Sequence, residues 1–133
     1  MVVNMIPTVD LPGYDAVRSA LVADQPAAVQ VAAAALAASD PAVAALASAV
    51  ATATELPAQR TAFAELSKAE VLRLADAKQK VFVYYCPMAP NYAYWLQAKP
   101  GLANPYMGVA MPECGEEVSL KVATKAAAGS AAK

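Results

Sequence analysis

Alanine-rich stretches that restart at prolines constrain the fold of this chain most strongly. The 133-residue sequence contains 35 alanines, and most of them lie in its first two thirds. Alanine is the best helix former and adds little side-chain volume, so this bias predicts closely packed helices rather than a sheet. A domain of this length can bury a core without metals or several disulfides.

Four helices are predicted between residue 14 and about residue 80. Each has apolar residues recurring on one helical face, and capping residues followed by proline mark where the later ones begin. The start signals are Asp24 with Pro26, Asp40 with Pro41, and Thr54 or Glu55 with Pro57. Short connections favour antiparallel neighbours, so we predict an all-α fold, an up-and-down four-helix bundle.

The pattern changes after residue 80. Residues 81–85 are β-branched or aromatic and predict a short strand, and residues 117–122 alternate in polarity and could pair with it. Prolines at 87, 90, 100, 105 and 112 exclude a regular helix between these segments. We therefore predict one domain over 1–133, with a helical bundle at 14–80, an irregular sulfur-containing cap at 81–122 with room for a two-stranded β element, and a flexible tail at 123–133.

Composition excludes several function classes. The chain has no histidine, which rules out Ser-His-Asp and Cys-His catalysis and imidazole zinc sites. Ten basic and eleven acidic residues without a basic cluster argue against nucleic acid as a partner. No phosphate-binding glycine loop or Cys-x-x-Cys motif is present, and we do not expect an enzyme.

Neither a membrane span nor a signal peptide is expected. Residues 25–39 form an uncharged stretch that is too short and too rich in alanine for a bilayer helix. Residues 1–8 lack the basic region and the long apolar region of a secretory signal. The chain is then either cytosolic or the mature part of an exported protein.

The cap contains the residues best suited to chemistry. Cys86 and Met88 flank one proline, and Met111 and Cys114 enclose another, so two thiols and two thioethers occur in two local pairs. Thiolates and thioethers are soft ligands that favour Cu(I) or Ag(I) over Mg, Ca or Mn. We predict a soft-metal site made by these four sulfurs, with Met107 as a further candidate ligand that ranks below them.

A competing interpretation needs no metal. Two cysteines in an exported domain most often form a disulfide. A bond between Cys86 and Cys114 would close a loop of 28 residues, which stabilises a fold by about 3–4 kcal/mol in the chain-entropy model. The cap would then be a disulfide-stabilised protein-interaction module, and its methionines would be packing residues. Sulfurs about 2.05 Å apart would favour this interpretation, and convergent free sulfurs would favour the metal site.

An ordered set of motifs resembles a known family. The motifs are Tyr85–Ala89 (Tyr-Cys-Pro-Met-Ala), Tyr94–Leu96, Asn104–Tyr106 with Gly108, and Met111 with Cys114 and Gly115, preceded by the segments 14–24 and 63–67. Together they resemble a bacterial periplasmic domain of unknown function, found alone in secreted proteins or appended to adaptor subunits of copper/silver efflux systems. The chain departs from that pattern at Met107, where an aromatic residue is expected, and in the shorter loop 89–93.

The resemblance implies a location and a partner. It implies a periplasmic or secreted, helical protein linked to heavy-metal resistance, with Cys86, Met88, Met111 and Cys114 at the matching positions. An efflux adaptor or another periplasmic protein is then the expected partner for sequestration or delivery of copper or silver.

Overall fold

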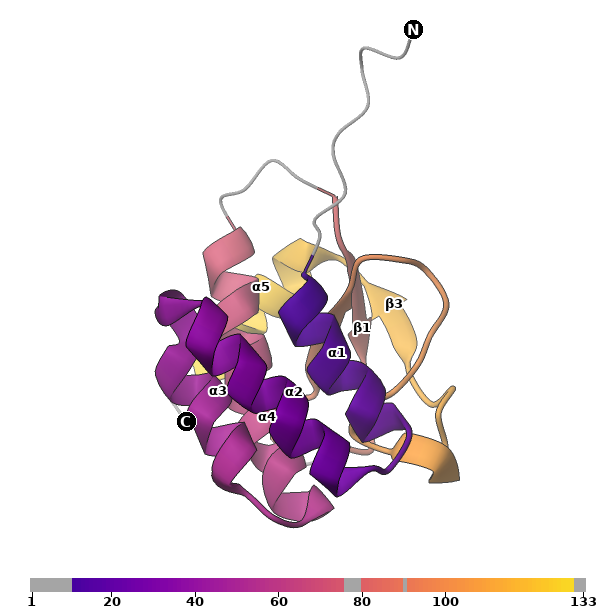
Figure 1. Cartoon of the computed structure of the whole chain (residues 1–133). Helices are drawn as coiled ribbons and strands as arrows, with labels where there is room; N and C mark the ends of the chain where they lie inside the picture. Colours follow the sequence, from indigo (N-terminus) through magenta and orange to yellow (C-terminus); the bar gives the residue numbers. More distant parts are fainter. Residues whose placement is uncertain (1–10, 76–79, 90, 131–133) are drawn as a thin grey trace, which may run out of the picture.

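Five α-helices and three short strands form the part of the chain that this computed structural model describes, residues 11–75, 80–89 and 91–130. The helices are α1 (Pro12–Val22), α2 (Pro26–Ser39), α3 (Ala44–Thr52), α4 (Leu56–Leu74) and α5 (Leu120–Ser130), with 3-10 turns η1 (Pro41–Val43) and η2 (Gly108–Ala110); the strands are β1 (Phe82–Tyr85), β2 (Tyr94–Gln97) and β3 (Glu116–Val118). Helices α1 to α3 lie on one side and the strands on the other (Figure 1). Helix α4 contacts α3, α5 and β2, and so joins the two parts.

The all-α prediction is wrong, because the sheet is definite and the fold is mixed α/β. The strands are antiparallel in the order β2-β1-β3, with Tyr84 facing Trp95 on one side and Glu117 on the other. Strand β2 was not predicted. Its residues Trp95, Leu96 and Gln97 are all buried, so it lacks the alternation of apolar and polar residues by which a half-buried strand is recognised.

Helix α5 occupies a region for which the sequence predicted a strand at 117–122 followed by a flexible tail. Ala123 and Ala127 lie one helical turn apart, are 0% and 3% exposed, and belong to the core. The Tyr92 hydroxyl donates a hydrogen bond of 2.7 Å to the Ala123 carbonyl. Alanine's helix propensity and this docking surface together favour a helix over a frayed tail. Residues 131–133 lie outside the described part.

Of the predicted helix starts, the one at Asp40 is confirmed as a cap and the one at Asp24 is not. Asp40 accepts a hydrogen bond from the Ala42 amide at 3.1 Å, although the turn it caps is the 3-10 turn η1 that precedes α3. Asp24 has a left-handed backbone (φ 57°), and its carboxylate accepts a bond of 2.6 Å from Arg60. Gln25 precedes α2 instead, without a side-chain capping bond.

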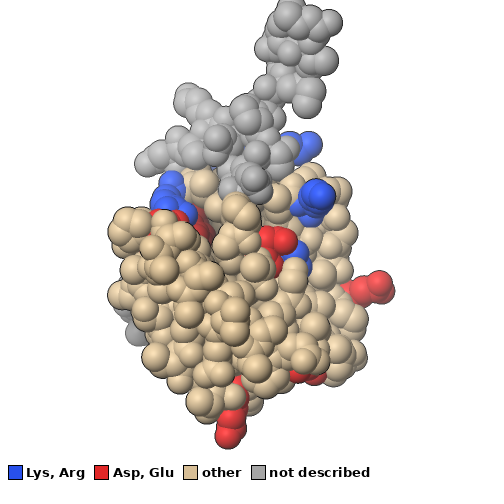
Figure 2. Space-filling view, viewed as in Figure 1, with Lys and Arg blue, Asp and Glu red and all other residues tan. Residues whose placement is uncertain are grey.

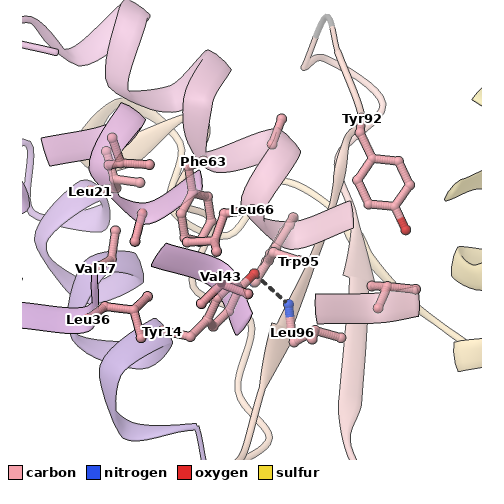
Figure 3. Close-up of a cluster of buried hydrophobic side chains, with 14 of the residues drawn as sticks. Tyr14, Val17, Leu21, Leu36, Val43, Phe63, Leu66, Tyr92, Trp95 and Leu96 are labelled. Carbon is pink, nitrogen blue, oxygen red and sulfur yellow. Dashed lines mark hydrogen bonds between the residues drawn. The ribbon is translucent and has the colours of Figure 1, made fainter. Parts of the chain in front are cut away.

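Tyr14 links the helices to the sheet. Its ring stacks on Phe63 with centroids 4.9 Å apart, and its hydroxyl lies 2.7 Å from Ser67 Oγ. The same hydroxyl accepts a bond of 3.2 Å from the Leu96 amide of β2 (Figure 3). Burial raises the pKa of Tyr14, so the hydroxyl remains neutral and available for these bonds.

Charged residues are scarce over the N-terminal helices. Helices α2 and α3 contain no charged residue, and the face they share with α1 has charges mainly at its margins (Figure 2). Within the described residues, no single helix has the length and apolar character needed to cross a membrane. Two consecutive helical segments, α2 and Pro41–Thr52, reach the required length and apolar composition when they are taken together. The chain bends by 119° at the break between them.

Candidate metal centre

Strand pairing brings the two cysteines together. In the β1–β3 ladder, Tyr85 faces Glu116. Cys86 follows β1 directly, and continuing the antiparallel register would place it opposite Gly115, the residue next to Cys114, so the two cysteine segments lie side by side. Both cysteines are free and lie 4.2 Å apart. We refer to Cys86 and Cys114 as the thiol pair.

Each member of the thiol pair stands at one end of a tight turn. The Ala89 amide donates to the Cys86 carbonyl at 3.3 Å, and the Cys114 amide donates to the Met111 carbonyl at 3.1 Å. A proline occupies the second position of both turns, where its restricted φ suits the turn geometry. The two proline motifs seen in the sequence are therefore the supports that position the two thiols.

Asn104 holds the Cys114 segment in place. Its side chain is completely buried; Nδ2 donates to the Cys114 carbonyl at 2.6 Å, while Oδ1 accepts from the amides of Tyr106 and Met107 at 2.8 and 3.1 Å. The Asn104 amide also donates to the Pro112 carbonyl at 2.8 Å. The sequence predicted only a turn here, because an asparagine before proline looks the same whether its amide is buried or exposed.

Gly115 allows β3 to approach β1 next to the thiol pair. Its φ is +137°, a conformation that side chains rarely adopt. A Cβ atom at this position would lie 2.8 Å from the Tyr85 carbonyl oxygen and 3.2 Å from Trp95 Cη2. Any larger residue would push β3 away from β1, and the thiols with it.

The candidate ligands differ in exposure. Cys86 is 0% exposed and belongs to the core, whereas Cys114 is half-buried. Met88 and Met111, on the two proline turns, are 63% and 39% exposed. Met107 is half-buried and packs against the core. The structure thus brings the two cysteines together and leaves Met88 and Met111 on the surface of the turns that carry them.

The spacing of the thiol pair suits one bridging metal ion. Two metal–thiolate bonds of about 2.3 Å hold their sulfurs between roughly 3.8 Å, for a tetrahedral angle, and roughly 4.6 Å, for a linear one. The separation of 4.2 Å between the two cysteines would let one ion contact both side chains. Among residues 11–75, 80–89 and 91–130, no three His, Cys, Asp or Glu side chains form a group that could hold a metal ion. Any third ligand would have to be a thioether, a backbone group or an external molecule.

Protonation opposes metal binding at this site. Desolvation raises the pKa of Cys114, and the neighbouring Cys86 raises it further. Because a metal binds the thiolate and not the thiol, an incoming ion must displace a proton from Cys114. A cation bound here would therefore need an affinity for sulfur that exceeds the cost of that proton release.

No family model, curated protein or solved structure matches this chain.

Proposed function

We propose that this protein binds a soft monovalent ion, Cu(I) or Ag(I), between the thiolates of Cys86 and Cys114. The observation that supports the proposal is the 4.2 Å spacing of two free cysteines held by separate turns. Sulfur donors prefer soft ions. In this proposal the protein has no catalytic role and sequesters the ion or passes it on.

Met88 and Met111 are proposed as supplementary ligands. Both are exposed on turns adjoining the thiol pair, where a thioether can meet an ion before it reaches the buried Cys86. Met107 ranks below them because it packs against the core. In keeping with the family resemblance, we place the protein in the periplasm or outside the cell, with an efflux adaptor or another periplasmic protein as the recipient of the ion.

Anaerobic titration of the reduced protein with Cu(I) against a competing chelator tests the proposal. Cys86→Ser and Cys114→Ser should each lose more affinity than the roughly 10–100-fold that removal of a supporting residue costs. Met88→Leu and Met111→Leu, which remove sulfur at nearly constant volume, should cause smaller losses, and Met107→Leu the smallest. Equal, weak binding by wild type and both cysteine variants would refute the thiolate site.

The pH dependence gives a second measurement. Because binding displaces a proton from Cys114, whose pKa is raised, the apparent affinity for Cu(I) should increase as the pH rises through the neutral range. A purely thioether site would show no such increase, because methionine does not titrate. The same titration at three pH values separates the two kinds of site.

The alternative is a disulfide-stabilised interaction module. Met88, Met111 and Val109 (62% exposed) are large apolar side chains on the surface of the cap, and such residues suit contact with a protein partner. This alternative requires oxidation of the thiol pair, which is free in the structure. Failure of the reduced protein to bind Cu(I) would favour it.

A further inference from the structure

We propose that the thiol pair also acts as an asymmetric redox pair, in which Cys114 reacts first with an external disulfide and Cys86 resolves the product. The proposal concerns the same cysteines as the proposed function, and only its consequence for metal binding depends on that function. Its basis is the proximity of the two thiols together with their unequal exposure.

Proximity makes an internal bond accessible. A disulfide needs sulfurs about 2.05 Å apart, and the two cysteines are 4.2 Å apart. Closing this gap requires a shift of about 2 Å. Cys114 belongs to the turn Met111–Cys114, whose four residues are exposed or half-buried, so part of this shift can come from the Cys114 side chain while Asn104 keeps its bonds to the backbone of the turn.

Unequal exposure sets the order of the steps. Cys86 is 0% exposed and cannot meet an external molecule without a local opening, whereas Cys114 is half-buried and reaches the surface. A cysteine reacts with an external disulfide only where that molecule has access to its sulfur. Cys114 is therefore the sulfur that a small disulfide can reach.

The reaction balances as two exchanges. The Cys114 thiolate attacks one sulfur of a small disulfide, RSSR; its S–S bond breaks, and one RS⁻ leaves with the electron pair and takes up a proton. The Cys86 thiolate then attacks the Cys114 sulfur of the mixed disulfide, and the second RS⁻ leaves. The protein loses two electrons and two protons, and RSSR becomes two RSH. The product has no thiolate for a soft ion, so oxidation switches off the proposed site.

Reduced protein treated with oxidised glutathione tests the order, with intact-mass spectrometry as the readout. Wild type should lose two hydrogens and retain no glutathione. Cys86→Ser should accumulate one glutathione on Cys114, and Cys114→Ser should react at least about tenfold more slowly. Comparable rates for the two variants, or a lasting glutathione adduct on wild type, would overturn the proposal.

Two additions keep the test decisive. Cys86→Ala replaces Cys86→Ser if serine in the core prevents folding, which circular dichroism would report. In native wild-type protein, iodoacetamide should label Cys114 before Cys86, and the reverse order would also overturn the proposal. Failure of the reduced protein to bind Cu(I), with the internal disulfide still forming, would refute the proposed function alone; binding of Cu(I) without disulfide formation would refute this inference alone.

Discussion

Buried polar side chains in this molecule hold nearby segments of the chain in place. The Asn104 side chain makes three hydrogen bonds within the cap, and Glu70, only 1% exposed, pairs with Arg73 on the next turn of α4 at 2.5 Å. Buried polar groups of this kind are costly when a partner is lost. They are the positions at which a one-atom change should have a measurable effect.

Glu70 predicts a specific dependence of stability on pH. Burial raises the pKa of Glu70, and Arg73 only partly opposes this. The folded state therefore holds the proton more tightly than the unfolded state, and its stability falls as the pH rises from about 4.5 through the folded-state pKa. Glu70→Gln removes this titration, so its free energy of unfolding relative to wild type should increase over that interval and then level off.

Urea unfolding at a series of pH values measures this difference. Glu65→Gln is the matched control, because Glu65 forms an i,i+3 ion pair with Lys68 at 3.3 Å but is 52% exposed. The control should show no comparable increase. A difference between Glu70→Gln and wild type that stays constant with pH would contradict the assignment.

At the scale of elements, α5 depends on small side chains. Ala123 and Ala127 let the helix pack closely, and α5 contacts both α4 and β1. A larger side chain on this face has no space without displacing the helix. The packing of α5 against the core therefore depends more on the volume of its side chains than on their charge.

Ala127→Leu should destabilise the fold by about 1–3 kcal/mol through overpacking. Ala128→Leu, on the exposed face of the same helix, should change the free energy of unfolding by no more than about 0.5 kcal/mol. Leucine and alanine are both strong helix formers, so the comparison isolates packing. Equal effects in urea denaturation would show that α5 does not dock through this face.

The helices were more predictable from the sequence than the sheet. Proline starts and apolar periodicity identify α1 to α4 because these signals are local. Strand β2 was not predicted because three of its four residues are buried and it lacks alternating polarity. Helix α5 was not predicted because it is an alanine-rich segment whose docking depends on residues distant in sequence. At the candidate site, the cysteines and methionines were identifiable by type, but the support from Asn104 was not, because its burial depends on tertiary contacts.

At the scale of the whole molecule, Arg60 connects three regions. Its Nε donates to the Pro105 carbonyl at 2.7 Å, and Nη2 donates to the Leu21 carbonyl at 2.8 Å and to Asp24 at 2.6 Å. Gly108 lies directly against this group, since a Cβ there would meet Asp24 and Arg60. The end of α1, the start of α4 and the cap thus meet at one guanidinium.

Arg60→Lys should therefore cost about 1.5–3 kcal/mol of stability, because an ammonium cannot reproduce the forked set of bonds. Arg18→Lys is the control: Arg18 pairs with Asp15 of its own helix and reaches the cap through a single bond of 3.5 Å to Ala103. The Arg18→Lys variant should lose less than about 1 kcal/mol of stability. Chemical denaturation of both variants measures the difference, and equal losses would contradict the connecting role of Arg60.

The link between Tyr14 and Leu96 has a consequence for the time course of folding. Its two residues are 82 positions apart, and such distant contacts form late because a long loop must close first. During synthesis, helices α1 to α4 leave the ribosome before β3 exists, so the sheet that aligns the two cysteines cannot be completed until most of the chain has been made. A partly synthesised chain that ends before β3 therefore carries Cys86 without the strand that brings Cys114 beside it.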